Sequence, residues 1–190
     1  MSNSEIEIKS VRNFTEIEPY MQSLCQTYQI VFATAPYNER FYPNEVQNLV
    51  YNHLKGKEQS TLLALKGERV VGFGLGAPVR NYPDIARRIR GLLPVKQTYY
   101  LADLGVLPDF RRKGLAHQIT ARHIETMNAS RHNYAYIVLR SSYSEDPAHF
   151  LFQKMGFEDM GVYMDIHSRK TDGSTRTDQR MILSKMVDDK

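Results

Sequence analysis

The chain is poor in cysteine, in long apolar runs and in excess charge of either sign. Its single cysteine, Cys25, cannot form an internal disulfide, and the polar, acidic start "MSNSEIEIKS" lacks the basic region and apolar core of a secretory signal. We therefore expect a reducing, cytoplasmic location. No window approaches the run of about 18 apolar residues that a bilayer span requires, so we expect no membrane partner.

The positive charge exceeds the negative charge by little, because 25 Lys and Arg residues stand against 21 Asp and Glu residues, for a net charge of +4. This excess favours anionic ligands but is far from the dense charge of a dedicated nucleic-acid-binding protein, so we expect no nucleic-acid partner. The six histidines show no spacing of the His-Glu-x-x-His kind. We therefore expect no metal site.

A chain of 190 residues with 42% hydrophobic composition is typical of one globular domain, which we expect to span residues 1–190. Apolar residues alternate in some segments, which predicts strands, and recur every three or four positions in others, which predicts helices. The predicted strands lie in residues 4–11, 60–79 (a hairpin that turns at Gly67), 98–107, 134–142, 161–167 and 179–187. The predicted helices follow Thr15, begin near Pro43, and cover residues 114–127 and 147–155.

The order of these elements predicts an α+β fold. Strand, helix and strand over residues 98–141 form one right-handed crossover, which makes its two strands parallel. The neighbouring pairs are hairpins and therefore antiparallel. We expect a mixed, mostly antiparallel sheet.

The segment "DLGVLPDFRRKGLAHQ", residues 103–118, leaves a strand and opens a helix. The first N–H groups of a helix lack intrahelical partners, and the helix dipole adds positive charge there, so such a corner binds phosphate. Arg111, Arg112 and Lys113 reinforce the positive field, while Gly114 lets an anion approach the backbone. The spacing is neither that of a nucleotide P-loop nor that of a dinucleotide fold. We interpret the corner as a pyrophosphate site, with a solvated charge run as the alternative.

The same segment resembles motif A of the GNAT superfamily of acyl-CoA-dependent N-acetyltransferases. The matching residues are Val106, Pro108, Arg111, Gly114 and Ala116. The segment "DPAHFLFQKMGFED" resembles the family's next segment, with Ala148, Phe152, Gly156 and Phe157 in register. The order of elements also fits the family from about residue 5 to residue 187, so the resemblance covers nearly the whole chain.

This resemblance implies a GNAT-like fold with helices on both faces of the sheet and a central parallel strand pair, residues 101–107 and 136–141, splayed to admit the pantetheine arm of acetyl-CoA. Amides of the arm would pair with backbone near Leu104 and Val106, as an added strand does. A free backbone donor near the splay point would stabilise the oxyanion. The implied residues for binding acetyl-CoA are Leu104, Gly105, Val106, Arg111, Arg112, Lys113, Gly114, Leu115, Ala116 and Phe152.

Transfer to an amine requires a base, because an alkylamine has a pKa of about 10.4 and is mostly protonated at neutral pH. We predict Asp103 as the base. The family often has a glutamate earlier on this strand, and this chain departs from that pattern with Tyr100. Strand alternation places Asp103 on the face of Leu101 and Gly105, where desolvation would raise the pKa of its carboxyl group. The alternative is that Asp103 forms a structural ion pair with Arg140 of the next strand.

This chain also departs from the family pattern at the position of the general acid. Many relatives have a tyrosine that protonates the leaving thiolate, where this chain has Phe152, which carries no acidic proton. We predict Tyr143, just past the strand, as the acid, and an ordinary surface tyrosine is the alternative. A thiol with a pKa of about 8.5 can also leave without an acid.

Two segments are candidates for the acceptor pocket. In "ATAPYNERFYP", Tyr37, Phe41 and Tyr42 surround Glu39, which could hold a cationic amine against an aromatic wall, with a plain surface loop as the alternative. Residues 80–97 form an expected helical insertion, which we interpret as a lid over the acceptor site or, more simply, as a covering surface helix. Its apolar stripe is Ile85, Ile89 and Leu92, and its basic residues are Arg87, Arg88 and Arg90.

Taken with the resemblance, these residues predict an enzyme that transfers the acetyl group of acetyl-CoA, its cosubstrate, directly to a primary amine of a small molecule or a peptide. One alternative is a regulatory module that binds acyl-CoA without catalysis, which the absent glutamate and tyrosine favour. A nucleic-acid-binding protein is a third class. The sequence leaves the acceptor open, and it leaves monomer and homodimer equally open.

Overall fold

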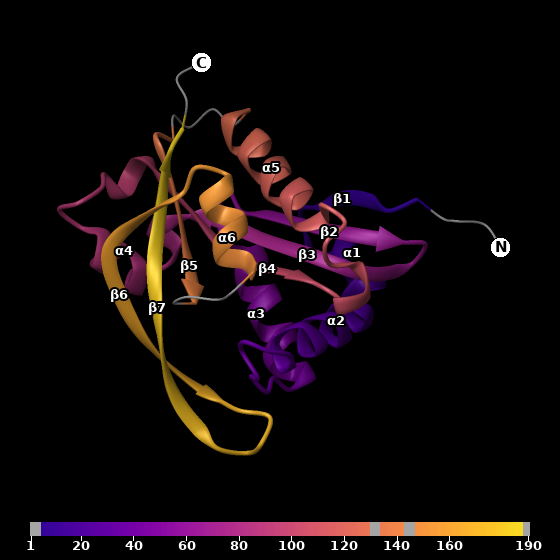
Figure 1. Ribbon diagram of the computed structural model, residues 1–190. Helices are drawn as coiled ribbons and strands as arrows, with labels where there is room; N and C mark the ends of the chain where they lie inside the picture. Colours follow the sequence, from indigo (N-terminus) through magenta and orange to yellow (C-terminus); the bar gives the residue numbers. More distant parts are fainter. Residues whose placement is uncertain (1–4, 130–133, 143–146, 188–190) are drawn as a thin grey trace.

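The computed structural model describes residues 5–129, 134–142 and 147–187, which form a seven-stranded sheet flanked by helices (Figure 1). The strands are β1 (Glu7–Val11), β2 (Ser60–Lys66), β3 (Arg69–Pro78), β4 (Thr98–Val106), β5 (Tyr136–Ser142), β6 (Glu158–Arg169) and β7 (Thr175–Met186). Their order in the sheet is β1-β2-β3-β4-β5-β7-β6. Only β4 and β5 are parallel to each other among these neighbours. The predicted α+β fold with one central parallel pair is confirmed.

Helices cover both faces of the sheet. They are α1 (Phe14–Ile17), α2 (Met21–Ala33), α3 (Pro43–Lys55), α4 (Pro83–Ile89), α5 (Leu115–Asn128) and α6 (Pro147–Lys154), with short 3-10 turns at Glu18–Tyr20, Val79–Asn81, Val95–Gln97 and Pro108–Phe110. Helix α2 packs on one face, where Tyr28 stacks on Phe73 of β3 with ring centroids 5.1 Å apart. Helix α5 packs on the other face, where a Cβ at Gly74 would collide with Ile119 and His123.

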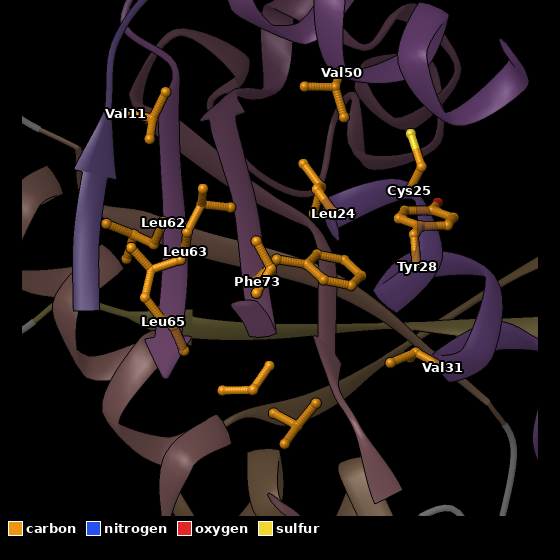
Figure 2. Close-up of a cluster of buried hydrophobic side chains, with 14 of the residues drawn as sticks. Val11, Leu24, Cys25, Tyr28, Val31, Val50, Leu62, Leu63, Leu65 and Phe73 are labelled. Atoms are coloured by element: carbon orange, nitrogen blue, oxygen red, sulfur yellow. The ribbon is translucent and has the colours of Figure 1, made fainter. Parts of the chain in front are cut away.

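The core between α2 and the sheet follows from the spacing of apolar residues. Met21, Leu24, Tyr28 and Val31 recur at helical intervals and are buried. Figure 2 shows Leu24 and Tyr28 next to Phe73, with side chains of β2 beyond them. Burial of such apolar surface is the main force that fixes α2 on the sheet.

Strands β4 and β5 separate after a short paired stretch. Their parallel pairing runs from Thr98 opposite Tyr136 to Leu101 opposite Leu139. Beyond Leu101, β4 continues to Val106 paired with β3, while β5 continues paired with β7. In the part of the chain that the structure describes, the edge of β4 that faces β5 is therefore open from residue 102 to residue 106.

The segment between β3 and β4 covers the sheet. Ile85 and Ile89 of α4 are fully buried in a cluster with Tyr100 and Val138. The prediction that Leu92 belongs to the buried apolar stripe is wrong, because its side chain is 58% exposed. Helix α4 ends at Ile89, and the chain turns at residue 91 before it reaches Leu92. The burial of α4 favours a covering helix over a lid.

No helix in the described part of the chain has the length and apolar character needed to span a membrane.

Candidate functional site

A cavity of about 550 Å³ lies where β4 and β5 diverge. Leu101 of β4 and Leu139 of β5, the last residues of the parallel pairing, both line it. Tyr28 of α2 lies on its wall from one face of the sheet, and Phe152 of α6 lies on its wall from the other. The cavity therefore passes through the sheet at the point where the two strands part.

The start of α5 lies just past the end of β4 and has no side-chain cap. Gly114 precedes the helix with φ +78°, and the N–H of Gln118, which donates to the Gly114 carbonyl at 3.0 Å, closes the first turn. The N–H groups of residues 115–117 thus have no acceptor from that turn. Apart from its chain neighbours, the only described atom within 4 Å of a Cβ at Gly114 would be Gln118 Nε2, at 3.8 Å. The corner is open and carries the positive end of the helix dipole.

Two of the three cations in this corner hold the loop in place. Arg111 donates from Nε to the Val106 carbonyl and from a terminal nitrogen to Thr34 Oγ1, each at 3.0 Å, which ties the corner to β4 and to the end of α2. Lys113 donates to the Asp109 carbonyl at 2.9 Å. Arg112 is exposed, with φ +60°.

The structure brings the ten predicted cofactor residues to two places. Residues 104–106 and 111–116 meet at the end of β4, and Phe152 lies in the cavity beside Leu104. A Cβ at Gly105 would lie 2.4 Å from the Phe73 ring, so this glycine is required for packing. Val106 contributes its carbonyl to Arg111.

Asp103 lines the cavity and accepts a hydrogen bond from the Tyr28 hydroxyl at 3.4 Å. Burial raises the pKa of the Asp103 carboxyl group, although the charge of Arg140 and the hydrogen bond from Tyr28 act to lower it. The prediction that Asp103 shares a face with Leu101 is wrong. The β3–β4 register shifts so that Leu75 opposes Asp103 and Gly76 opposes Leu101, with residue 102 as the extra residue. Leu101 therefore packs with Phe152, on the face opposite Tyr28.

The alternative interpretation of Asp103, a structural ion pair with Arg140, is wrong, because the two side chains are not in contact. The ion pairs within 4.0 Å in the described part of the chain do not include Arg140. Arg140 lines the same cavity as Asp103 and acts on it only through the field of its charge.

The predicted acid, Tyr143, lies outside the described residues. Three other tyrosines line the cavity, Tyr28, Tyr37 and Tyr82. Burial raises the pKa of the Tyr28 and Tyr82 phenols, which keeps them protonated and able to donate hydrogen bonds. The Tyr82 hydroxyl oxygen lies 2.9 Å from His53 Nδ1.

Glu39 does not offer a free carboxylate to an amine, which corrects the interpretation of the "ATAPYNERFYP" segment. It is buried, and Arg180 donates to its Oε1 at 2.7 Å, with Lys170 at 3.9 Å. The Arg180 guanidinium also lies over the Tyr37 ring, 4.7 Å from its centroid. The aromatic wall is therefore already occupied by a cation of the protein.

Two buried histidines also line the cavity, and neither is among the predicted site residues. Burial lowers the pKa of His53 to about 4 and that of His123 to about 3, so both are neutral at physiological pH. His53 follows Val46 and Val50 on the buried face of α3, a spacing that is visible in the sequence. His123 Nδ1 lies 3.0 Å from Ser60 Oγ.

No group of three or more His, Cys, Asp or Glu side chains in the described residues is arranged to hold a metal ion.

Comparisons with known proteins agree with this geometry. The model of the acetyltransferase (GNAT) family matches residues 19–157. No curated protein sequence matches the chain significantly. Among solved structures, an N-acetyltransferase from Staphylococcus aureus Mu50 superposes with a TM-score of 0.69 at 16% identity, over 97% of this chain and 100% of that one.

Two further structures show the same fold. A ribosomal-protein-alanine N-acetyltransferase from Brucella melitensis superposes with a TM-score of 0.67 at 15% identity, over 95% of this chain and 99% of that one. Arabidopsis thaliana NAA60 in complex with acetyl-CoA superposes with a TM-score of 0.65 at 15% identity, over 96% of this chain and 99% of that one.

Proposed function

The chain belongs to the acetyltransferase (GNAT) family, and on that premise we propose that it transfers the acetyl group of acetyl-CoA directly to a primary amine of a small molecule or a peptide. In this proposal, residues 1–190 form one acyltransferase domain, and residues 80–97 are a helical insertion within it. One observation carries the proposal. The open edge of β4 leads from the cavity at Leu101 to the uncapped start of α5.

The residues of this path fit the parts of acetyl-CoA. The unpaired N–H groups of residues 115–117 and the exposed guanidinium of Arg112 suit a pyrophosphate. Open backbone groups of β4 between residues 102 and 106 suit the amides of pantetheine. Arg111 positions the corner through Val106 and Thr34, and is assigned no contact with the phosphates.

Acetyl-CoA supplies a thioester that an amine can attack without a covalent enzyme intermediate. Asp103 takes the proton that the amine must lose, and its raised pKa makes it a stronger base than an ordinary aspartate. Tyr28 holds the Asp103 carboxylate by a hydrogen bond. The new C–N bond replaces the C–S bond, and the sulfur leaves as a thiolate, which needs no obligatory acid because the pKa of a thiol is about 8.5. Tyr143 as an acid stays a prediction.

A regulatory module that binds acyl-CoA without catalysis is the second candidate. It is favoured by Tyr100 and Phe152, which stand where many relatives have the catalytic glutamate and tyrosine. Both side chains are buried.

A screen for thiol release separates these functions. The protein is incubated with acetyl-CoA and a panel of primary amines, with an acyl-chain series as the second axis. We expect thiol release that depends on both the enzyme and a particular amine. Tight CoA binding with no release from any amine would identify the regulatory module, and nucleic-acid affinity that falls steeply with salt would identify the third class.

A further inference from the structure

Arg140 is the first residue of β5 beyond the parallel pairing with β4, and its side chain lines the cavity together with Asp103. Its guanidinium carbon lies 5.8 Å from the centroid of the Tyr100 ring. The side chain is partly buried. A cation is thus held at the point where β4 and β5 part, on the wall that also carries the proposed base.

The other charged side chains on this wall are already matched. Arg180 and Glu39 form a buried ion pair at 2.7 Å, and both line the cavity. Behind them, Lys170 contacts Asp178, and it also lies 3.9 Å from Glu39. This group of two acids and two bases is balanced within itself.

Arg140 lacks such a match. In residues 5–129, 134–142 and 147–187, no carboxylate lies within 4.0 Å of its guanidinium. Burial acts to lower the pKa of Arg140, but its interaction with Tyr100 and the negative charges of Asp103 and Asp84 outweigh burial and raise that pKa. Arginine stays charged at any physiological pH. Its charge is therefore permanent, and the acids of the described residues act on it only from beyond contact distance.

The proposed reaction makes this imbalance larger. When Asp103 takes the proton of the amine, its carboxylate becomes neutral, and the cavity loses one of the negative charges that act on Arg140. A partly buried cation without a counter-charge is unfavourable. A carboxylate on the acceptor would restore the balance, because a guanidinium binds a carboxylate through two parallel hydrogen bonds.

We propose that Arg140 binds a carboxylate of the acceptor, and that the acceptor is an amino acid or a similar small molecule carrying an amine and a carboxylate a few atoms apart. This inference rests on the proposed acetyl transfer and names its substrate class. In this arrangement Asp103 receives the amine and Arg140 the carboxylate, from neighbouring strands. Arg140 is a specificity-determining residue and takes no proton.

The test compares matched acceptors that differ only in the carboxylate. The proteinogenic amino acids and their primary amides are assayed for acetyl-CoA-dependent thiol release by the wild type and by Arg140→Gln, Arg140→Lys and Arg88→Gln. Arg88 is an exposed arginine of α4 and serves as the matched control. We expect the wild type and Arg88→Gln to show a kcat/KM about ten- to a hundredfold higher for the best amino acid than for its amide.

In Arg140→Gln the preference should disappear through loss of the amino-acid rate, while the rate with the amide stays. Arg140→Lys, which keeps the charge without the two-pronged geometry, should retain part of the preference. A merely structural role for Arg140 would lower both rates together. If Arg140→Gln fails to fold, the preference for a carboxylate is tested by inhibiting the wild type with N-acetylglycine and with N-acetylglycinamide. We expect N-acetylglycine, the acid, to inhibit at least about tenfold more strongly than the amide.

Equal wild-type rates with acids and amides, or equal inhibition by the two products, overturns the role of Arg140 and leaves acetyl transfer intact. A preference that survives in Arg140→Gln has the same consequence. Absence of thiol release with every acid and every amide, in a protein that binds acetyl-CoA, overturns the proposed function and this inference together.

Discussion

Replacement of Asp103 by asparagine is expected to lower kcat/KM for thiol release by about 10²- to 10⁴-fold, the usual contribution of a general base, and to leave acetyl-CoA affinity unchanged. The amide of asparagine fills the same space beside Tyr28 but cannot take a proton at neutral pH. Steady-state kinetics and calorimetric titration of acetyl-CoA measure the two effects separately. Asp165→Asn, at an exposed position of β6, is the control.

The raised pKa of Asp103 predicts how the rate of thiol release depends on pH. Burial raises the pKa of this carboxyl group, and a base acts only when ionised, so the wild-type rate should fall as the pH drops through that raised pKa. The asparagine variant should lack this limb, and its residual rate should rise with pH toward the amine pKa of about 10.4. An asparagine variant with the wild-type rate and pH profile would show that Asp103 is not the base.

Stability should change in the opposite direction to activity. Because the folded-state pKa of Asp103 is raised, its contribution to folding is complete below the unfolded pKa of about 3.9 and is lost as pH rises through the folded value. At neutral pH the buried carboxylate is therefore a cost. We expect Asp103→Asn to unfold at a higher temperature than the wild type, which rules out misfolding as the reason for its lower rate.

Replacement of Gly114 by valine is expected to weaken acetyl-CoA binding by about 100-fold or more. The added side chain would project from the corner into open space, because Gln118 Nε2, at 3.8 Å, is the only atom of the described residues within 4 Å of a Cβ there, chain neighbours apart. It would therefore obstruct an anion at the N–H groups of residues 115–117, and two lost hydrogen bonds to a charged group are worth about 3 kcal/mol or more. Isothermal titration calorimetry with acetyl-CoA measures the loss.

Valine also strains a backbone with φ +78°, so the control must share that strain. Gly91 has φ +87° and is not among the residues that line the cavity. Its chain neighbours apart, a Cβ added there would meet no atom of the described residues within 4 Å. Gly91→Val should lose similar thermal stability and keep its acetyl-CoA affinity within about threefold, since it removes no phosphate contact. Equal affinity in Gly114→Val and Gly91→Val would place the phosphates elsewhere.

The elements could be predicted from the sequence because their signals are local. Met21, Leu24 and Tyr28 recur at helical spacing and form the buried face of α2. The glycine between β2 and β3 marks a tight turn with φ +62°, and the last hairpin turns at Gly173 with φ +86°. Such patterns need no knowledge of distant residues, so the strands, most helices and the parallel crossover followed from them.

The orientation of site residues could not be predicted where it depends on distant partners. Residue 102 is an extra residue only relative to β3, so alternation within β4 gave no sign that Asp103 and Leu101 face opposite sides. The partner of Glu39 is Arg180, which is 141 positions away in the sequence. Arg111 looked like a phosphate ligand in a run of cations, but its guanidinium turns back to Val106 and Thr34.

The central claim is that the start of α5 holds the pyrophosphate of acetyl-CoA, and backbone NMR tests it most directly. Amide ¹H–¹⁵N shifts are followed while the labelled protein is titrated with acetyl-CoA and, separately, with S-acetylpantetheine, which lacks the pyrophosphate. We predict that the amides of residues 115–117 shift downfield with acetyl-CoA but not with S-acetylpantetheine. Amides along the open edge of β4 should shift with both compounds. Saturation by acetyl-CoA with the amides of residues 115–117 unmoved would contradict the claim.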